Sequence, residues 1–216
     1  NPDEDICFVI LNAYTPNASA SYCRYPQGFS YSISGLGSYT PASNNLHGFE
    51  NKICRGFGCT FGHLGSEGWN SFGGAATDAT KEVILNYQAN GWYMNLSVDP
   101  ENVPWKKFLT DERYANEDVG IYEGGYYCAF GIYRSSNTSI MRTTIDEVIF
   151  NVPSREAIYK RMMQQAYGDS WQYDYEKFVE YDAINRNSTP QLLRSTADAP
   201  KEDRLQYYPM VIIHEQ

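Results

Sequence analysis

The chain has 216 residues, of which 17 are Lys or Arg and 26 are Asp or Glu, so its formal net charge is −9. Such an acidic chain is poorly suited to nucleic acids, because non-specific binding depends on Lys and Arg neutralising phosphates. Hydrophobic residues make up 42% and charged residues 20%, a balance that excludes intrinsic disorder. The longest apolar run, Ile6–Leu11, falls far short of the roughly 20 residues of a membrane-spanning helix. Aromatic residues reach 15%, which suits a carbohydrate- or peptide-binding cleft.

The cysteines contain no C-x-x-C pair, which argues against a zinc knuckle and a dithiol redox motif. Their odd number leaves at least one thiol unpaired, and we expect buried free thiols. They are Cys7, Cys23, Cys54, Cys59 and Cys128. The chain begins with Asn1, so either a signal peptide has been removed or the chain is a fragment. We therefore expect an extracytoplasmic location, whether secreted, periplasmic or on the cell surface. Triplets of the N-x-S/T type begin at Asn17, Asn95, Asn137 and Asn187.

Two strands and a long helix are predicted in the first third of the chain. The apolar run within residues 5–12 predicts a buried strand, and the alternation of apolar residues with Ser over 29–34 predicts a half-buried one. Residues 46–64 carry apolar side chains three and four positions apart, the spacing of one helical face. Several glycines interrupt this helix, which indicates close approach of another backbone.

The remaining elements are mostly helical. Asp78 is the predicted cap of a helix over 78–89, which ends at Asn90-Gly91. The clearest helix covers 153–167, with Pro and Ser at its start and Gly168 just past its end. We also expect short helices over 105–109 and 174–182, turns with short extended pieces over 119–142, and a final strand over 208–214.

This order of elements predicts an α/β domain, with α+β as the alternative: a mixed sheet with packed helices. The domain is expected to cover 1–186 and to be followed by a polar C-terminal tail over 187–216. Two strands are few for a sheet. We therefore expect part of the sheet to lie upstream of Asn1, in an N-terminal segment that still associates with the domain.

The helix predicted over 46–64 has the geometry of a metal-binding helix. Arg55 and Cys59 are four residues apart and therefore lie on one face. In the zinc motif H-E-x-x-H, two His at this spacing bind the metal and the intervening Glu acts as general base. In metzincins a Gly three residues after the second His lets the chain turn toward a third ligand. Gly62 stands at that position here.

The segment RGFGCTFGHLGSEG, residues 55–68, resembles the active-site segment of the IgA-peptidase family of metzincin-like metallopeptidases, whose pattern is roughly H-E-x-x-H-x-F-G-x-L-x-D-E-Y. The matching scaffold residues are Gly58, Phe61, Gly62, Leu64 and Glu67. The resemblance runs from about Asp3 to Arg186 through further blocks at 107–125, 131–142, 150–161 and 177–186. It implies a metzincin-like catalytic domain of a bacterial exported protein, and zinc-dependent peptide-bond hydrolysis as the ancestral reaction.

The residues that such a family uses for chemistry are replaced in this chain. Arg55 stands at the first zinc His, Gly56 at the general-base Glu and Cys59 at the second His. Ser66 and Gly68 replace the Asp and Tyr of the D-E-Y element. A guanidinium offers no lone pair to a metal, and glycine has no side chain to take a proton from water. We therefore predict no catalytic residues and no cofactor.

The former substrate cleft is expected to survive as a binding surface in which Arg55 supplies the charge of the missing metal and pairs with Glu67. In the resemblance, Met141 falls in the Met-turn beneath the metal site, and Tyr133-Arg134 survives from the element before it. The candidate residues of this cleft are Arg55, Cys59, Glu67, Tyr133, Arg134 and Met141.

The expected function is therefore that of an inactive homologue of a zinc metallopeptidase that binds a peptide, a protein or a glycan, and not a nucleic acid. One alternative is an active zinc endopeptidase with an atypical site. In that case Cys59, His63 and Glu67, each four residues from the next, would form one helical stripe of zinc ligands. A further alternative is nucleophilic hydrolysis by Cys59 with His63 as its base.

Overall fold

A computed structural model of the protein describes residues 6–11, 19–23, 30–35, 46–69, 72–142 and 149–187. The N-terminal strands β1 (Ile6–Leu11), β2 (Ser19–Cys23) and β3 (Ser30–Gly35) form a mixed sheet in the order β1-β3-β2. β1 pairs with β3 in parallel and β2 pairs with β3 antiparallel. The strands predicted over 5–12 and 29–34 are confirmed. β2 was not predicted: Ala20 and Tyr22 alternate with Ser19 and Ser21, but the surrounding residues rich in Asn, Ser, Pro and Tyr favoured a loop.

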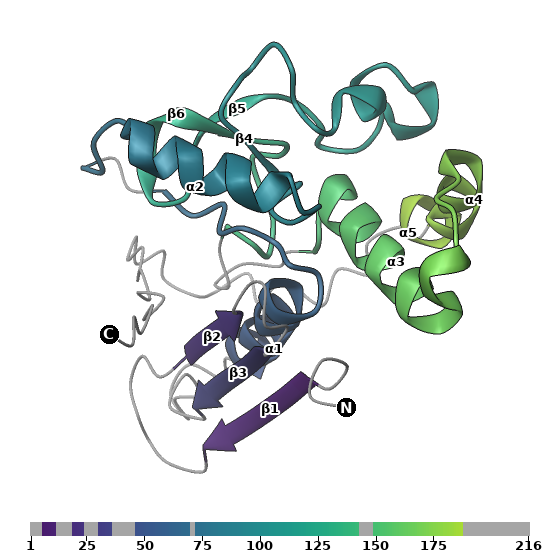
Figure 1. Ribbon diagram of the computed structural model, residues 1–216, viewed down its shortest axis with the longest axis horizontal. Helices are drawn as coiled ribbons and strands as arrows, with labels where there is room; N and C mark the ends of the chain where they lie inside the picture. Colours follow the sequence, from purple (N-terminus) through teal and green to yellow (C-terminus); the bar gives the residue numbers. More distant parts are fainter. Residues whose placement is uncertain are drawn as a thin grey trace, which may run out of the picture.

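Helix α1 (Leu46–Thr60) packs against β2 and β3 (Figure 1). The helix predicted over 46–64 is therefore confirmed, but it ends four residues earlier. His63 takes a left-handed backbone conformation, with φ of 50°, so the chain leaves the helical path there. The backbone N–H of Leu64 donates to the carbonyl of Gly58 at 3.0 Å, which caps the end of the helix.

The second sheet is antiparallel, in the order β4-β6-β5, and consists of β4 (Leu96–Ser97), β5 (Tyr122–Gly125) and β6 (Cys128–Arg134). Tyr126 and Tyr127 connect β5 to β6 with positive φ at both residues, 48° and 65°, a conformation that usually selects Asn or Gly. This hairpin accounts for most of the extended pieces predicted over 119–142.

Helix α2 (Asp78–Gln88) lies beside the second sheet (Figure 1). Ile84 of α2 is fully buried against Leu96 and Ile132 of the sheet. The predicted helix is confirmed, but its cap is Thr77, whose side chain accepts from the backbone N–H of Thr80 at 3.1 Å. Asp78 instead occupies the first turn, where its negative charge favours the helix dipole.

Helix α3 (Val152–Tyr167) is capped by Asn151 and ends at Gly168, which has a φ of 70°. The helix predicted over 153–167 is thus confirmed almost to the residue. α4 (Tyr175–Tyr181), capped by Asp174, confirms the short helix predicted over 174–182. Further short elements are the 3₁₀ turns η2 (Lys106–Leu109), η3 (Glu112–Tyr114) and η4 (Gly168–Ser170) and the helix α5 (Ala183–Asn187).

An aromatic core joins α3 and α4 to the 3₁₀ turns. Its largest buried members are Trp105, Phe108, Tyr114, Tyr159 and Phe178. Beside this core, Arg155 of α3 donates from Nε to Asp182 Oδ1 at 2.8 Å and from Nη2 to Glu117 Oε1 at 3.0 Å. Asp182 is fully buried, so the pairing with Arg155 offsets the cost of holding its charge away from water.

The described elements combine helices with two small sheets, an arrangement compatible with the α+β class. No helix among the described residues is long and apolar enough to cross a bilayer. The predicted tail over 187–216 and the strand over 208–214 fall outside the described residues beyond Asn187, which ends α5.

Candidate functional site

The end of α1 and the segment after it bring three of the replaced positions together. Arg55 and Cys59 lie one turn apart on α1, and Arg55 Nη2 donates to Ser66 Oγ at 2.8 Å. Ser66 is buried, whereas Arg55 and Cys59 are half-buried. Burial raises the pKa of the Cys59 thiol above its ordinary value, and the nearby charge of Arg55 offsets part of that rise. The thiol is therefore protonated and unreactive near neutral pH.

The chain returns to Arg55 because of the glycines that follow α1. A Cβ on Gly62 would lie 2.9 Å from the carbonyl oxygen of Gly58 and 2.9 Å from Ile158 of α3, so only glycine allows this close approach. Residues 65–68 are then held by backbone bonds: Tyr126 N–H donates to Ser66 O at 2.9 Å, and Tyr127 N–H donates to Gly68 O at 2.8 Å. The hairpin turn of the second sheet thus fixes Ser66 in front of α1.

Met141 lies against Gly58 in this part of α1. It occupies a tight turn closed by a bond from Arg142 N–H to Ser139 O at 2.9 Å. The side chain is fully buried and belongs to a small apolar cluster against which Cys59 packs. A Cβ on Gly58 would come within 2.8 Å of its sulfur, so α1 rests directly on the methionine. Met141 supports the site but does not line an open cleft.

Glu67 is fully buried and joins four segments of the chain. Its Oε1 accepts from Asn95 Nδ2 and from Asn151 Nδ2, both at 2.8 Å. Its Oε2 accepts from Ser139 Oγ at 2.6 Å and from Asn151 Nδ2 at 3.1 Å. Burial raises the pKa of the Glu67 carboxyl, while the three donors and the charge of Arg134 act in the opposite direction. Every lone-pair direction of this carboxylate is thus used inside the protein.

Arg134 and Tyr133 of β6 occupy structural positions. Arg134 is 3% exposed, and its Nη1 donates to the carbonyl of Gly124 at 2.6 Å. Its guanidinium also lies 5.9 Å from the ring centre of Trp69. Burial, followed by the charge of Arg142, lowers the pKa of Arg134 to about 10. Tyr133 is half-buried and pairs with Glu123 and Ser97 across the sheet.

Two of the predicted contacts are wrong. Arg55 pairs with Ser66 and not with Glu67, whose oxygens are bonded by Asn95, Ser139 and Asn151. The stripe Cys59, His63, Glu67 does not form, because α1 ends at Thr60 and the left-handed backbone of His63 redirects the chain. Within the described residues, no cluster of three His, Cys, Asp or Glu side chains is placed to hold a metal ion.

His63 lies against an aromatic ring. Its ring stacks on Trp92 with centroids 3.7 Å apart, and it lines a cavity of about 210 Å³ that is also lined by Trp92 and Arg161. Burial, and secondarily the charge of Arg161, lowers the pKa of His63 to about 3. The imidazole is therefore neutral at physiological pH. Its place against Trp92 does not suit a general base for Cys59.

The low pKa of His63 predicts a stability change with pH. Its folded-state pKa of about 3 lies below the ordinary 6.5, so the unfolded chain binds the proton first and stability falls as pH drops below 6.5. Between pH 7 and pH 5 we expect the protein to lose about 2 kcal/mol more than a His63→Phe variant, which keeps a flat ring against Trp92. Urea unfolding of both proteins at both pH values measures this, and equal losses would contradict it.

Sequence reasoning missed Ser66 as a member of the site, together with the donors Asn95, Ser139 and Asn151. For Ser66 a signal existed, since the resemblance aligns it with the Asp of the D-E-Y element. For the three donors no local signal distinguishes them from surface polar residues. No known family model and no curated protein matches this chain.

The residues at the replaced positions do not fit zinc. Arg55 is a permanent cation with no lone pair, Ser66 is a neutral hydroxyl already bonded to it, and the Cys59 thiol is held in its protonated form by burial. What this arrangement offers chemically is a half-buried guanidinium at the end of α1, suited to contact a carbonyl or carboxylate group.

Proposed function

We propose that this domain is a catalytically silent homologue of the IgA-peptidase family of zinc metallopeptidases, which keeps the scaffold and acts by binding a peptide, a protein or a glycan outside the cytoplasm. The observation that carries the proposal is the hydrogen bond between Arg55 and Ser66. It joins the residue that the resemblance aligns with the first ligand to the residue that it aligns with the Asp of the motif. Gly58, three residues after Arg55, lies against the buried Met141 in its tight turn.

Two further features support this assignment. The Gly58 and Gly62 positions of the motif are close contacts between α1 and its neighbours, which explains why glycine is needed there whether or not the site is active. Glu67, the polar residue among those that match the motif, acts as a buried structural acceptor. The retained residues thus maintain the fold, and the replaced ones are those that would bind metal and move protons.

The test is to restore the motif. We expect the unmodified protein, purified without a metal-affinity tag, exposed to excess Zn²⁺ and dialysed, to hold close to zero zinc per chain by elemental analysis. A variant with Arg55→His, Gly56→Glu, Cys59→His and Ser66→Asp should hold close to one, because three nitrogen and oxygen donors then meet at the end of α1.

The matched control keeps Ser66 and carries only the other three substitutions; it should bind zinc more weakly because one ligand is missing. Circular dichroism first establishes that both variants are folded. A folded fourfold variant that holds no zinc would reject the assigned positions. Stoichiometric zinc in the unmodified protein would reject the silent-site proposal itself and would call for a protease assay.

A further inference from the structure

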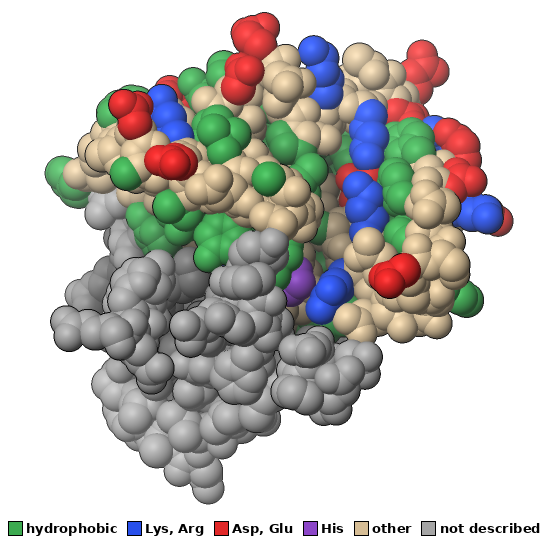
Figure 2. Space-filling view, in the orientation of Figure 1, with side chains coloured by type: hydrophobic (Ala, Val, Ile, Leu, Met, Phe, Trp, Pro, Cys, Tyr) green, Lys and Arg blue, Asp and Glu red, His purple; other side chains and the backbone are tan. Residues whose placement is uncertain are grey.

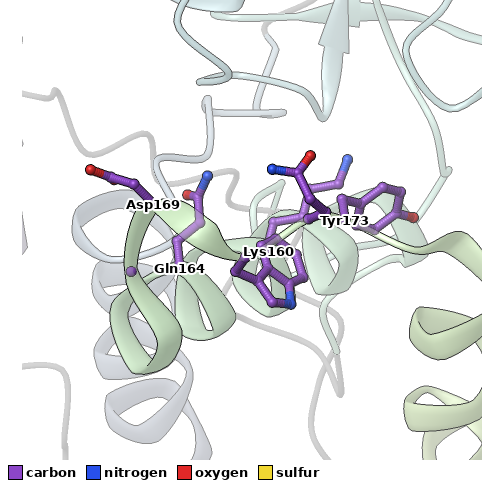
Figure 3. Close-up of a pocket in the computed structure, with 7 residues that line it drawn as sticks. Lys160, Gln164, Asp169 and Tyr173 are labelled. Carbon is purple, nitrogen blue, oxygen red and sulfur yellow. The ribbon is translucent and has the colours of Figure 1, made fainter.

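Two cavities adjoin along one face of α3, away from Arg55 and Ser66. One, of about 390 Å³, lies between α3 and the segment after it (Figure 3). The other, of about 210 Å³, lies between α3 and the residues that follow α1 and α2. Both are lined by Lys160 and Gln164, one helical turn apart, and we call these two neighbouring cavities together the α3 groove. Its size is that of a small-molecule site.

The groove offers amide groups to a ligand. Gln164 extends from α3, and Gln172 lies on the segment that leads to α4. An amide both donates and accepts hydrogen bonds, which is what recognition of a hydroxyl requires, because a hydroxyl does the same. A ligand rich in hydroxyl groups therefore matches this lining better than an apolar one.

The groove also has an aromatic wall. The rings of Trp171 and Tyr173 meet at 69° with centroids 6.2 Å apart, and both are half-buried. A second edge contact holds Trp171 against Tyr159 of the core. These contacts fix the two rings while part of each surface faces the groove. Rigid aromatic rings supply contact area at low entropic cost and suit the C–H faces of sugar rings.

Charged side chains of both signs line the groove: Lys160 and Arg161 are its cations, and Glu156 and Asp169 are its anions. Glu156 is buried and accepts from Lys107, which lies next to the groove but does not line it, and Glu156 also forms an ion pair with Lys160 at 3.1 Å. Two ammonium groups therefore face this one carboxylate. Arg161 adds a further cation to the same wall. Asp169 lies at the far end of the larger cavity (Figure 3). In the space-filling view, Lys and Arg side chains follow the boundary between α2 and the helices α3 and α4 (Figure 2).

We propose that the α3 groove binds a short acidic saccharide. Its carboxylate would lie near Lys160 and Arg161, its hydroxyls would bond Gln164 and Gln172, and a sugar ring would pack on Trp171. A peptide strand is a poorer match, because the groove is walled by a helix and loops and has no sheet edge to extend. Nucleic acid is a poorer match because it needs a longer row of cations. The proposal uses none of the residues at the Arg55–Ser66 centre. The saccharide-binding proposal and the proposed function can therefore fail independently of each other.

Calorimetric titration with trigalacturonate, its fully methyl-esterified form, sialyllactose and triglutamate tests the proposal. We expect at least one of the two acidic saccharides to bind with a submillimolar dissociation constant, and affinity to fall with added salt. The esterified trisaccharide keeps the sugar rings without the charge, so it should bind about tenfold more weakly than trigalacturonate if trigalacturonate is the ligand.

Lys160→Ala and Gln164→Ala should each weaken that binding about tenfold, whereas Lys106→Ala, which removes an exposed lysine outside the groove, should leave it unchanged. Glu156 keeps Lys107 as a partner in the Lys160 variant, so the fold is expected to persist, and circular dichroism checks this. The proposal is overturned if neither acidic saccharide binds, if triglutamate binds as tightly, or if the groove variants bind like the unmodified protein.

Discussion

Replacing Glu67 by Ala is expected to lower the free energy of unfolding by about 3–5 kcal/mol, among the largest effects of any single change in this chain. The carboxylate is fully buried and accepts from Asn95, Ser139 and Asn151. Its removal leaves three donors without an acceptor where no solvent reaches them, and it also opens a cavity. Urea unfolding at pH 7 measures the loss.

The matched control is Glu67→Gln, which keeps the shape and one carbonyl oxygen. That oxygen can still accept from Asn95 and Asn151, and the hydroxyl of Ser139 can turn to accept from the new amide. We expect this variant to lose roughly 1–2 kcal/mol. An Ala variant within the error of the unmodified protein would show that the network contributes nothing.

The unmodified protein and the Glu67→Gln variant should differ in how their stability changes with pH. Burial raises the pKa of Glu67 in the folded protein, so the folded chain holds its proton more tightly than the unfolded chain does. Its contribution to stability is therefore present at low pH and is lost as pH rises through the folded-state pKa. The difference in stability between the unmodified protein and Glu67→Gln should shrink as the pH rises above the ordinary glutamate pKa of 4.5.

Replacing Arg155 by Met is expected to cost about 3–5 kcal/mol for a related reason. The change removes the partner of the fully buried Asp182 and breaks the connection from α3 to Glu117. Methionine fills a similar volume, so most of the loss reports the unpaired carboxylate. Thermal and urea unfolding both measure it.

Two comparisons sharpen this prediction. Adding Asp182→Asn to Arg155→Met removes the unpaired charge and should recover part of the loss, which a double-mutant cycle quantifies. Arg113→Met breaks the exposed contacts with Asp111 and Glu176 and should have a much smaller effect. Equal losses at Arg155 and Arg113 would contradict the role assigned to burial.

The helices and two N-terminal strands could be predicted because their signals are local. Asp174 and Gly168 mark helix ends by their own chemistry, wherever they lie in the fold. The turn between β5 and β6 could not be predicted, since neither Tyr126 nor Tyr127 favours a positive φ by itself. Backbone hydrogen bonds from Tyr126 to Ser66 and from Tyr127 to Gly68, both distant in the sequence, hold that conformation.

The site was predictable only in part for the same reason. Spacing within α1 brought Arg55 and Cys59 to one face. The acceptor role of Glu67 depends on Asn95, Ser139 and Asn151, which are 28, 72 and 84 residues away in the sequence. The groove along α3 likewise combines segments that no periodicity links. Long-range contacts of this kind follow from tertiary packing and leave no pattern in a single sequence.

The burial of Asn95 has a consequence for how the protein can be produced. Its side chain bonds both backbone groups of Gly65 and the carboxylate of Glu67, yet it begins an N-x-S triplet. A host that attaches N-linked glycans to nascent chains would place a sugar on Asn95 Nδ2, the nitrogen that donates two of these bonds. A chain modified there could not bury the Asn95 side chain in the folded protein. Ser97→Ala removes the acceptor triplet and sacrifices only a local turn with Asp99, so it is the safer change for expression in such cells.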